Sequence, residues 1–215
     1  MKNKLERYDY NLKSEYVIQE GKEFYKNSKG NWNKKFDNKN PIILELACGN
    51  GEYTVERSFK DPLRNYIGID VKGARIWKGA KKLENNKSKN ACFLRIQIEN
   101  ILNFFKCSEV DEILISFPDP RPKKRDVKKR LTNMKFLDIY YKILKKNGLL
   151  MLKTDDIDFF NYSLDQLKSS DFIISNYTND LYKSKKYDLF KEIQTKYELR
   201  FLSKGKKIKF LKCLR

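Results

Sequence analysis

Short apolar runs of strand length alternate with longer amphipathic segments from Pro41 onward, and this alternation constrains the fold more than any other feature. The apolar runs are residues 42–46, 66–69, 92–98, 112–117 and 149–153. The segments with helical spacing lie near residues 52–60, 72–86, 132–146 and 156–169. Because strands that alternate with helices form βαβ units, we predict an α/β fold whose mostly parallel sheet carries helices on both faces.

The end of the chain departs from this alternation. A short strand is expected around residues 172–175, and two extended runs follow at residues 193–202 and 207–214. The glycine of Lys204-Gly205-Lys206 lies between these two runs, which is typical of a hairpin. We therefore expect a C-terminal antiparallel hairpin strand at the edge of the sheet.

Residues 1–40 are polar and charged, and their large apolar side chains are scattered rather than periodic. We predict a basic N-terminal arm here, partly helical and outside the main core. A chain of 215 residues suits one hydrophobic core, so we expect residues 41–215 to form a single domain.

The chain is strongly basic, with 47 Lys and Arg against 28 Asp and Glu and a net charge of +19. Codon bias or solubility is the alternative explanation, but bias exchanges Arg for Lys without creating an excess over acids. The charge is also clustered, because residues 121–130 hold seven basic side chains and residues 203–215 hold six. Clustered positive charge favours a nucleic-acid partner, whose neutralised phosphates release counterions.

The absence of histidine and the wide spacing of the cysteines restrict the reactions and metal sites that this chain can support. There is no histidine, which excludes imidazole general-base catalysis and a His-ligated metal. The four cysteines are too far apart in the sequence to indicate a metal site or a redox pair, and we expect free thiols in a reducing cytoplasm. The first residues lack a signal-peptide core and no run reaches membrane-spanning length, so we expect a cytoplasmic protein with no membrane partner and no metal.

The first two strands run into groups suited to a nucleoside cofactor. The first ends in Glu45-Leu46-Ala47-Cys48-Gly49-Asn50-Gly51, whose small residues let a ligand approach the backbone, although a tight turn alone also uses glycine. The second ends at Asp70, where such folds hold a ribose. The carboxylate of Glu45 would repel a pyrophosphate and attract a sulfonium or amino group, which favours S-adenosylmethionine over NAD.

A stiff loop follows the apolar run at residues 112–117. It reads Phe117-Pro118-Asp119-Pro120-Arg121-Pro122-Lys123-Lys124-Arg125. Because proline fixes its own φ and restricts the residue before it, Asp119 is held in a defined direction beside a cluster of cations. This arrangement suits a positioned acid next to a polyanion.

Five motifs in this order resemble those of the bacterial tRNA (guanine-N7-)-methyltransferases, and the resemblance covers nearly all residues from about 41 to the end. They are Glu45 to Gly51, Tyr66 to Asp70, Phe117 to Arg125, Lys153-Thr154-Asp155 and Thr195-Lys196-Tyr197-Glu198. The resemblance implies a Rossmann-like class I methyltransferase with a seven-stranded sheet. It also implies methyl transfer from S-adenosylmethionine to N7 of the variable-loop guanine of tRNA, at position 46.

The resemblance further implies a role for particular residues. For the cofactor they are Glu45, Gly49, Gly51, Asp70 and Asp119, the last at the edge shared with the guanine pocket. For the substrate they are Lys123, Asp155, Thr195 and Glu198. The catalytic pair is Asp119 and Asp155.

The residue types fit this chemistry. Guanine N7 carries a lone pair and no proton, so its attack on a methyl group needs alignment and no general base. A carboxylate such as Asp119 or Asp155 would accept hydrogen bonds from the N1 and N2 edge of the guanine. The absence of histidine therefore costs this reaction nothing.

Some positions depart from the family pattern. Ala47 stands where glycine is frequent, Arg121 replaces the usual tryptophan, and Asp126 falls where histidine is common. Residues 95–100 lack the usual Asp-Ala pair at the adenine edge, so Glu99 or Asn100 is the substitute we expect.

Each of these residues also has a structural alternative. Asp119 could satisfy loop amides, Asp70 could cap the next helix, and Lys123 could attract phosphate diffusely. Thr195 and Glu198 could be ordinary strand residues. An amino-methyltransferase acting on DNA or protein and a catalytically silent RNA-binding subunit are the other functions weighed, and monomer and homodimer both stay open.

Overall fold

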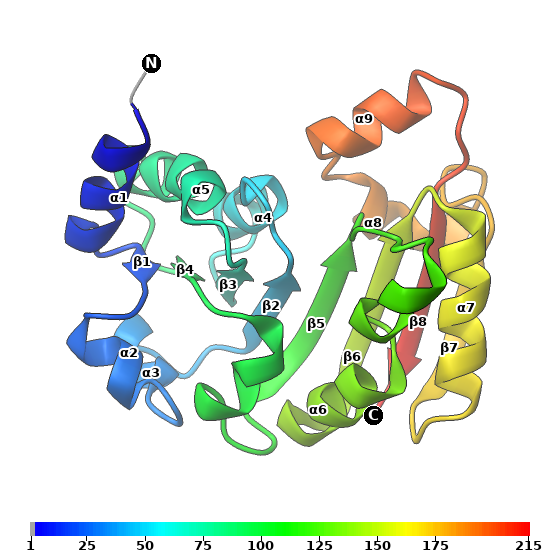
Figure 1. The fold of residues 1–215 in the computed structure, drawn as a ribbon, viewed down its shortest axis with the longest axis horizontal. Coiled ribbons are helices and arrows are strands. Elements are labelled where there is room, and N and C mark those ends of the chain that lie inside the picture. Colours follow the sequence, from blue (N-terminus) through cyan, green and yellow to red (C-terminus); the bar gives the residue numbers. More distant parts are fainter. Residues whose placement is uncertain (1–2) are drawn as a thin grey trace.

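The computed structural model describes residues 3–215, apart from the side chains of residues 187–189. One eight-stranded sheet crosses the molecule in the order β1-β4-β3-β2-β5-β6-β8-β7 (Figure 1). The strands are β1 (Val17–Ile18), β2 (Ile42–Leu46), β3 (Asn65–Ile69), β4 (Ala91–Leu94), β5 (Val110–Ser116), β6 (Leu144–Thr154), β7 (Ile173–Thr178) and β8 (Lys209–Leu214). All pairings between neighbours are parallel except those of β8 with β6 and with β7.

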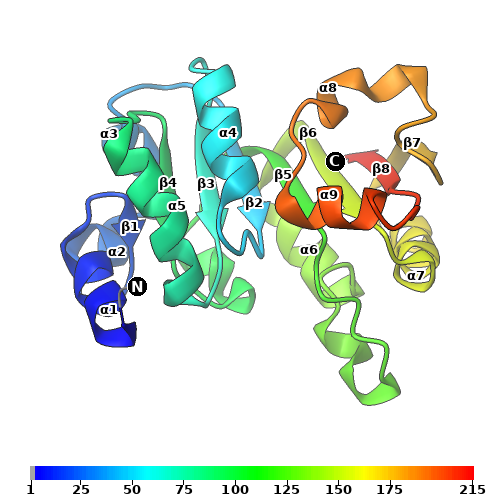
Figure 2. The ribbon, with the colours of Figure 1, turned by 90° about the horizontal axis from the view of Figure 1, so that it is seen from above.

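Helices cover both faces of this sheet. They are α1 (Lys4–Lys13), α2 (Glu23–Asn27), α3 (Trp32–Phe36), α4 (Glu52–Lys60), α5 (Gly73–Asn85), α6 (Met134–Ile143), α7 (Ile157–Lys168), α8 (Asp188–Lys191) and α9 (Lys196–Leu202), with 3-10 turns η1 (Ile98–Asn103), η2 (Lys124–Lys129) and η3 (Lys185–Tyr187). Figure 2 shows the molecule from above the carboxyl ends of β2 and β5, with α4, α5 and α9 around them. None of the described helices is both long and apolar enough to cross a membrane.

The alternation along β2 shows how the two faces are filled. Ile42, Leu44 and Leu46 belong to a core that also contains residues of α6 and α7. Ile43 points the other way, into a second cluster with residues of α4 and α5. Every residue of β2 is buried, as expected for a central strand of a parallel sheet. The predicted mostly parallel α/β fold is therefore confirmed.

The predicted number of seven strands is wrong, because the N-terminal segment adds an eighth at the edge beside β4. The expectation that residues 1–40 lie outside the core is also wrong for several of their side chains. Val17 is fully buried, and Trp32 is fully buried with its ring 5.0 Å from that of Phe105. The indole N–H of Trp32 donates to the carbonyl oxygen of Phe104 at 2.9 Å. Isolated apolar residues without a period give no warning that they enter a core.

The expected C-terminal hairpin is wrong in one of its two strands. Residues 193–202 contain helix α9 and do not pair with β8, which instead lies between β6 and β7. Thr195 caps this helix, since its hydroxyl accepts a hydrogen bond from the Glu198 amide at 3.2 Å. The cap at Thr195 and the buried side chain of Glu198 thus stabilise a helix here, although the composition is typical of a strand.

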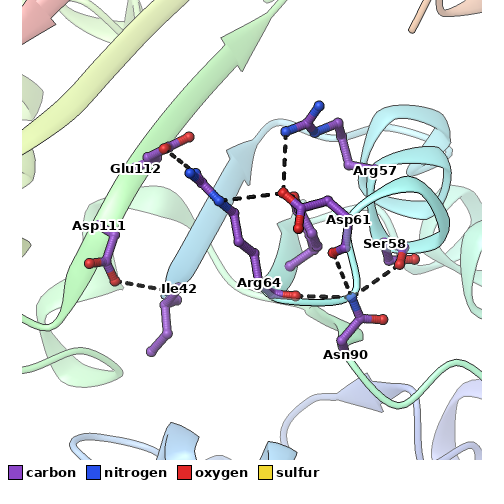
Figure 3. Close-up of polar contacts among 9 residues, drawn as sticks. Ile42, Arg57, Ser58, Asp61, Arg64, Asn90, Asp111 and Glu112 are labelled. Atoms are coloured by element: carbon purple, nitrogen blue, oxygen red, sulfur yellow. Dashed lines mark hydrogen bonds and ion pairs between the residues drawn. The ribbon is translucent and has the colours of Figure 1, made fainter. Parts of the chain in front are cut away.

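A polar network fixes the end of the sheet that faces away from the strand carboxyl ends (Figure 3). The Arg64 guanidinium pairs with Asp61, with 3.4 Å between Nε and Oδ2, and with Glu112 at the start of β5. The Asn90 side-chain amide donates to the carbonyl oxygens of Ser58, Asp61 and Arg64 at 2.9–3.2 Å. These bonds join the connections before β3, β4 and β5 at one edge, so the opposite edge is left for loops that carry chemistry.

Candidate active site

Two adjoining cavities lie over the carboxyl ends of the central strands. Ala47 and Asp119 line both of them, so the two form one continuous cleft. The first, of about 240 Å³, is called the apolar cavity here, and its walls include Val71, Ile96, Ile98, Leu131 and Phe136. The second, of about 220 Å³, is called the polar cavity, and its walls include Glu45, Gly49, Glu52, Arg75, Thr195 and Tyr197.

The turn between β2 and α4 forms the floor of the cleft. Ala47, Gly49 and Gly51 all have positive φ, at 54°, 57° and 68°. A side chain at Gly49 would meet no atom within 4 Å, whereas one at Gly51 would overlap the Phe93 ring. Gly49 therefore opens directly on the polar cavity, and Gly51 is needed for packing. Ala47 adopts the same left-handed backbone with a Cβ, which carries strain.

Glu45 lies at the end of β2 and is only 5% exposed. Its Oε2 accepts hydrogen bonds from the Thr54 amide at 3.0 Å and the Thr54 hydroxyl at 2.5 Å. Burial raises the pKa of Glu45 to about 7, although the bonds from Thr54 act in the opposite direction. A carboxylate in this state gains from any cation that enters the polar cavity.

Asp70 follows β3 and joins two loops. Its Oδ2 accepts from the Gly49 amide at 2.9 Å, and its Oδ1 accepts from the Lys72 amide at 2.8 Å. Asp70 is buried and lines the apolar cavity. The carboxylate thus has a fixed orientation at the rim, but Asp70 does not cap α5, whose N-cap is Lys72 without a side-chain cap hydrogen bond.

Asp119 lies where the two cavities meet, and its side chain is 62% exposed. It accepts a hydrogen bond from the Arg121 amide at 3.1 Å, and the Arg121 Nε lies 3.3 Å from its Oδ2. Positive φ angles at Phe117 and Arg121, 48° and 49°, bend the loop sharply on both sides of Asp119. The Arg130 Nε donates to the Pro120 carbonyl oxygen at 3.0 Å and holds this shape.

Helix α9 closes the polar cavity from the C-terminal side. Thr195 and Tyr197 line it, and the Lys196 amide donates to Glu52 Oε2 at 2.7 Å. Phe201 packs on Phe117 with 5.6 Å between ring centroids. The start of α9 is therefore attached to α4 on one side and to the Asp119 loop on the other.

A buried ion pair underlies this attachment. The Lys153 ammonium lies 2.6 Å from Glu198 Oε1, and the two side chains are 1% and 0% exposed. Lys153 also donates to the Phe190 carbonyl oxygen at 3.0 Å, and the Tyr182 hydroxyl donates to Glu198 at 2.9 Å. Burial lowers the pKa of Lys153, while Glu198 opposes that shift. Glu198 thus faces the interior and not the cleft.

The sequence-predicted residues divide between the cleft and its surroundings. Those that line the cleft are Glu45, Gly49, Asp70, Glu99, Asp119 and Thr195. Those that line neither cavity are Gly51, Asn100, Lys123, Asp155 and Glu198.

Asp155 and Lys123 lie outside the two cavities. Asp155 follows β6, and its carboxylate lies 2.5 Å from the Lys206 ammonium. Lys123 is exposed immediately before η2. Asp155 therefore follows β6, the neighbour of β5 in the sheet, and Lys123 lies in the loop after β5.

Sequence reasoning missed the apolar walls and one cation. Val71 and Ile96 follow the strands β3 and β4 and line the apolar cavity, and Arg75 lines the polar cavity. The available signal was the position of Val71, an apolar residue directly after the acid that ends a strand. Among the described residues there is no group of three or more acids or cysteines placed to hold a metal ion.

The fold defines the class of protein. Superposition on the 16S rRNA methyltransferase KamB gives a TM-score of 0.62 at 11% identity, covering 81% of this chain and 87% of that one. Phosphoethanolamine N-methyltransferase 2 of Haemonchus contortus, solved in complex with S-adenosyl-L-methionine, gives a TM-score of 0.54 at 12% identity, covering 82% of this chain and 49% of that one. The chain therefore has the Rossmann-like methyltransferase fold that the sequence predicted.

The sequence comparisons are more specific. A family described as "Putative methyltransferase" matches residues 39–211. The tRNA (guanine-N(7)-)-methyltransferase of Christiangramia forsetii is 44% identical over 219 residues, covering 98% of this chain and 97% of that protein. The enzyme of the same name from Cytophaga hutchinsonii is 38% identical, covering 98% of this chain and 96% of that protein. The chain belongs to the tRNA (guanine-N7-)-methyltransferase family of enzymes.

Proposed function

We propose that this protein transfers a methyl group from S-adenosylmethionine to N7 of a tRNA guanine, the variable-loop guanine at position 46. The observation that carries the proposal is the two-part cleft with Asp119 at its junction. A cofactor that occupies both cavities would have its methyl group near their junction, and the exposed carboxylate of Asp119 at that point can contact both the cofactor and a base that enters from outside.

The residues present fit S-adenosylmethionine. The apolar walls suit the faces of an adenine ring, and Glu99 at the edge of this cavity is the group we assign to its polar rim, with exposed Asn100 beside it. Asp70, fixed by two amides, suits the ribose hydroxyls, which donate hydrogen bonds. The open face of Gly49 leaves room for the amino-acid end. When bound, the cofactor supplies an electrophilic methyl group beside a cationic sulfur.

The acids of the polar cavity complement that positive charge. Glu45 and Glu52 line this cavity, and only Arg75 among its lining residues is cationic. At an effective dielectric constant of about 20, two opposite charges 4 Å apart attract with about 4 kcal/mol before desolvation. The carboxylates of this polar cavity would repel the pyrophosphate of a cofactor such as NAD.

Asp119 and Asp155 form the substrate side of the proposal. Exposed Asp119 accepts hydrogen bonds from the guanine N1 and N2 edge and stabilises the positive charge that the base gains on methylation. Asp155, Lys123 and Thr195 bound the entrance on the same side. Glu198 acts through Thr195. Its side chain pairs with Lys153 in the interior, and its amide donates to the Thr195 hydroxyl at the start of α9.

The partner and the setting follow from the same proposal. The basic surface binds tRNA phosphates, and all four cysteines are free thiols, as in a protein of the reducing cytoplasm. We therefore place the reaction in the cytoplasm with tRNA as the macromolecular substrate.

Labelled methyl transfer to unmodified tRNA tests the proposal. The tRNA is then cleaved chemically at N7-methylguanine, and the fragment length locates the modified base. We expect one cleavage, in the variable loop. Binding of S-adenosylmethionine and tRNA without transfer would identify a silent subunit, and a label at another base or atom would contradict the proposal directly.

A further inference from the structure

A third cavity, of about 390 Å³, lies between α1 and the amino end of α5, and we call it the α1–α5 groove. Its lining contains five cations and no acidic side chain. The cations are Lys4, Arg7, Lys72, Arg75 and Arg95. They come from three separate parts of the chain, which the fold gathers at one place.

The charge of this groove is uncompensated. None of the ion pairs between described residues involves any of the five cations. In the 121–130 cluster, by comparison, two of the seven cations have an ion pair, since Arg121 pairs with Asp119 and Lys129 pairs with Asp126. A set of cations without an ion-pair partner raises the local positive potential and favours a polyanion.

The groove is also preformed. The Arg7 guanidinium lies over the Trp77 ring, 5.1 Å from its centroid. The Arg95 Nε donates to the Val71 carbonyl oxygen at 3.2 Å. Helix α1 is fixed to α5 by a hydrogen bond of 2.9 Å from the Asn11 side-chain amide to the Gly73 carbonyl oxygen. Two of the cations therefore point in set directions before any ligand binds.

The position of the groove connects it with the cleft. Val71 lines both the groove and the apolar cavity, and Arg75 lines both the groove and the polar cavity. Tyr8 lies on the groove wall with half of its surface exposed. Cations that follow a backbone, with an aromatic ring between them, are the combination that binds single-stranded nucleic acid.

We propose that the α1–α5 groove binds the tRNA backbone next to the modified nucleotide, with Tyr8 stacking on an unpaired base. This inference rests on the proposed function, because it assumes that tRNA enters the cleft. It assigns the N-terminal helix a direct part in substrate binding, at the rim of the strand carboxyl ends where α1 and α5 lie (Figures 1 and 2).

Charge-matched triple variants test the groove. The first is Lys4→Gln, Arg7→Gln and Arg95→Gln, which leaves the residues that line the cleft unchanged. The control is Lys26→Gln, Lys34→Gln and Lys39→Gln, which removes the same charge from the segment before β2, at the other end of the strands (Figure 1). Affinity for tRNA is measured for both as a function of salt, and S-adenosylmethionine binding by calorimetry reports on the fold of each.

We expect the groove variant to bind tRNA roughly tenfold or more weakly near 0.15 M salt, with a salt slope smaller by roughly two to three. The control is expected to stay within about threefold of the wild type, and cofactor binding to be equal in all three proteins. Equal losses in both variants, or no loss in the groove variant, would overturn the inference. If the groove variant loses cofactor binding, Lys4→Gln with Lys72→Gln replaces it, since both side chains are exposed.

The wild-type protein separates this inference from the proposed function. If it methylates tRNA at a guanine N7 and the groove variants bind tRNA as it does, only the groove assignment fails. If it neither binds nor methylates tRNA, the proposed function fails, and the groove assignment fails with it.

Discussion

The two sides of the cleft hold their acidic side chains by different means. On the side of β2 and β3, Glu45 accepts from an amide and a hydroxyl, and Asp70 accepts from two backbone amides. On the side of β5 and β6, each acid has a side-chain cation as a partner, Arg121 for Asp119 and Lys206 for Asp155, and Asp119 also accepts from the Arg121 amide. The first side has no cationic side-chain partner among these bonds, whereas the second side has two side-chain cations that can exchange.

This difference corresponds to two kinds of ligand. A backbone amide cannot leave its acceptor without unfolding the turn, so the first side keeps one shape for a small cofactor. A lysine or arginine side chain can leave its carboxylate when a base offers N–H donors and a phosphate offers a new anion. The second side can thus change partners as tRNA binds. The ion pair of Lys153 and Glu198 also contains a side-chain cation, but it is buried where no ligand reaches it, so its partners do not exchange.

The largest effect is expected from Glu198→Ala. It leaves the Lys153 ammonium buried without its carboxylate, which costs about 3–5 kcal/mol of unfolding free energy. Denaturant unfolding measures this loss. Methyl transfer is expected to fall as well, at temperatures where the variant is folded, because the ion pair with Lys153 no longer fixes α9, whose N-cap Thr195 lines the polar cavity.

Two controls sharpen this prediction. Lys206→Ala removes the partly exposed cation beside Asp155 and is expected to cost less than about 1 kcal/mol. The double change Lys153→Met with Glu198→Leu removes both buried charges and is expected to regain most of the stability lost in Glu198→Ala. A Glu198→Ala protein as stable as the wild type would show that the pair does not hold α9.

The next effect is expected at Asp119. Asp119→Asn keeps the shape of the loop residue but loses the charge at the junction of the two cavities, and we expect methyl transfer to slow by roughly 100-fold. Asp70→Asn is the comparison on the other side of the cleft. It should raise KM for the cofactor by roughly tenfold or more and change kcat less, because the carboxylate fixes the cofactor loops. Single-turnover transfer from labelled cofactor measures both, and a wild-type rate for Asp119→Asn would refute its role.

Glu45 predicts a pH dependence of cofactor binding. Its pKa of about 7 means that the carboxylate is mostly ionised at pH 8 and mostly neutral at pH 6. Because a cationic ligand favours the ionised form, cofactor affinity should weaken by about tenfold from pH 8 to pH 6. Glu45→Gln should bind more weakly at pH 8 and lose most of this dependence. Calorimetry at the two pH values checks this, and an unchanged slope in Glu45→Gln would assign the titration to another group.

The same pKa affects stability in the opposite direction. The folded pKa lies above the ordinary value of 4.5, so the folded state holds the proton more tightly than the unfolded chain. The free energy of unfolding should therefore fall as pH rises from about 4.5 to about 7, through this group alone. Glu45→Gln should flatten that part of the stability curve.

The sequence predicted the first side better than the second, for a physical reason. The strand at residues 42–46, the glycine turn and Asp70 leave a local pattern in the sequence, because an apolar run, glycines with positive φ and an acid after a strand can each be seen without their distant partners. The strand predicted for the segment with Thr195 and Glu198 is wrong, because the contact that holds this segment as a helix joins Glu198 to Lys153, 45 residues earlier. No local pattern reports such a pair.

The prediction that the N-terminal segment lies outside the core is wrong for the same reason. Trp32 is buried because Phe104 and Phe105 provide a carbonyl acceptor and a stacking partner, more than seventy residues along the chain. The two-residue strand β1 exists only through its parallel pairing with β4. Elements that depend on a distant partner, and not on their own period, are those the sequence does not reveal.

The smallest effect is expected from Arg121→Gln, which tests whether the second side exchanges its partners. Arg121 is partly exposed and pairs with Asp119, so the change should alter stability by less than about 1 kcal/mol. If the arginine moves from Asp119 to a phosphate when tRNA binds, the variant should bind tRNA a few-fold more weakly at low salt. The difference should vanish at high salt, where screening removes the contact. Cofactor affinity should change less than tRNA affinity, because Arg121 lines the apolar cavity but the fixed acids on the side of β2 and β3 do not depend on it. A loss of cofactor affinity equal to the loss of tRNA affinity would mean that the two sides act as one rigid unit.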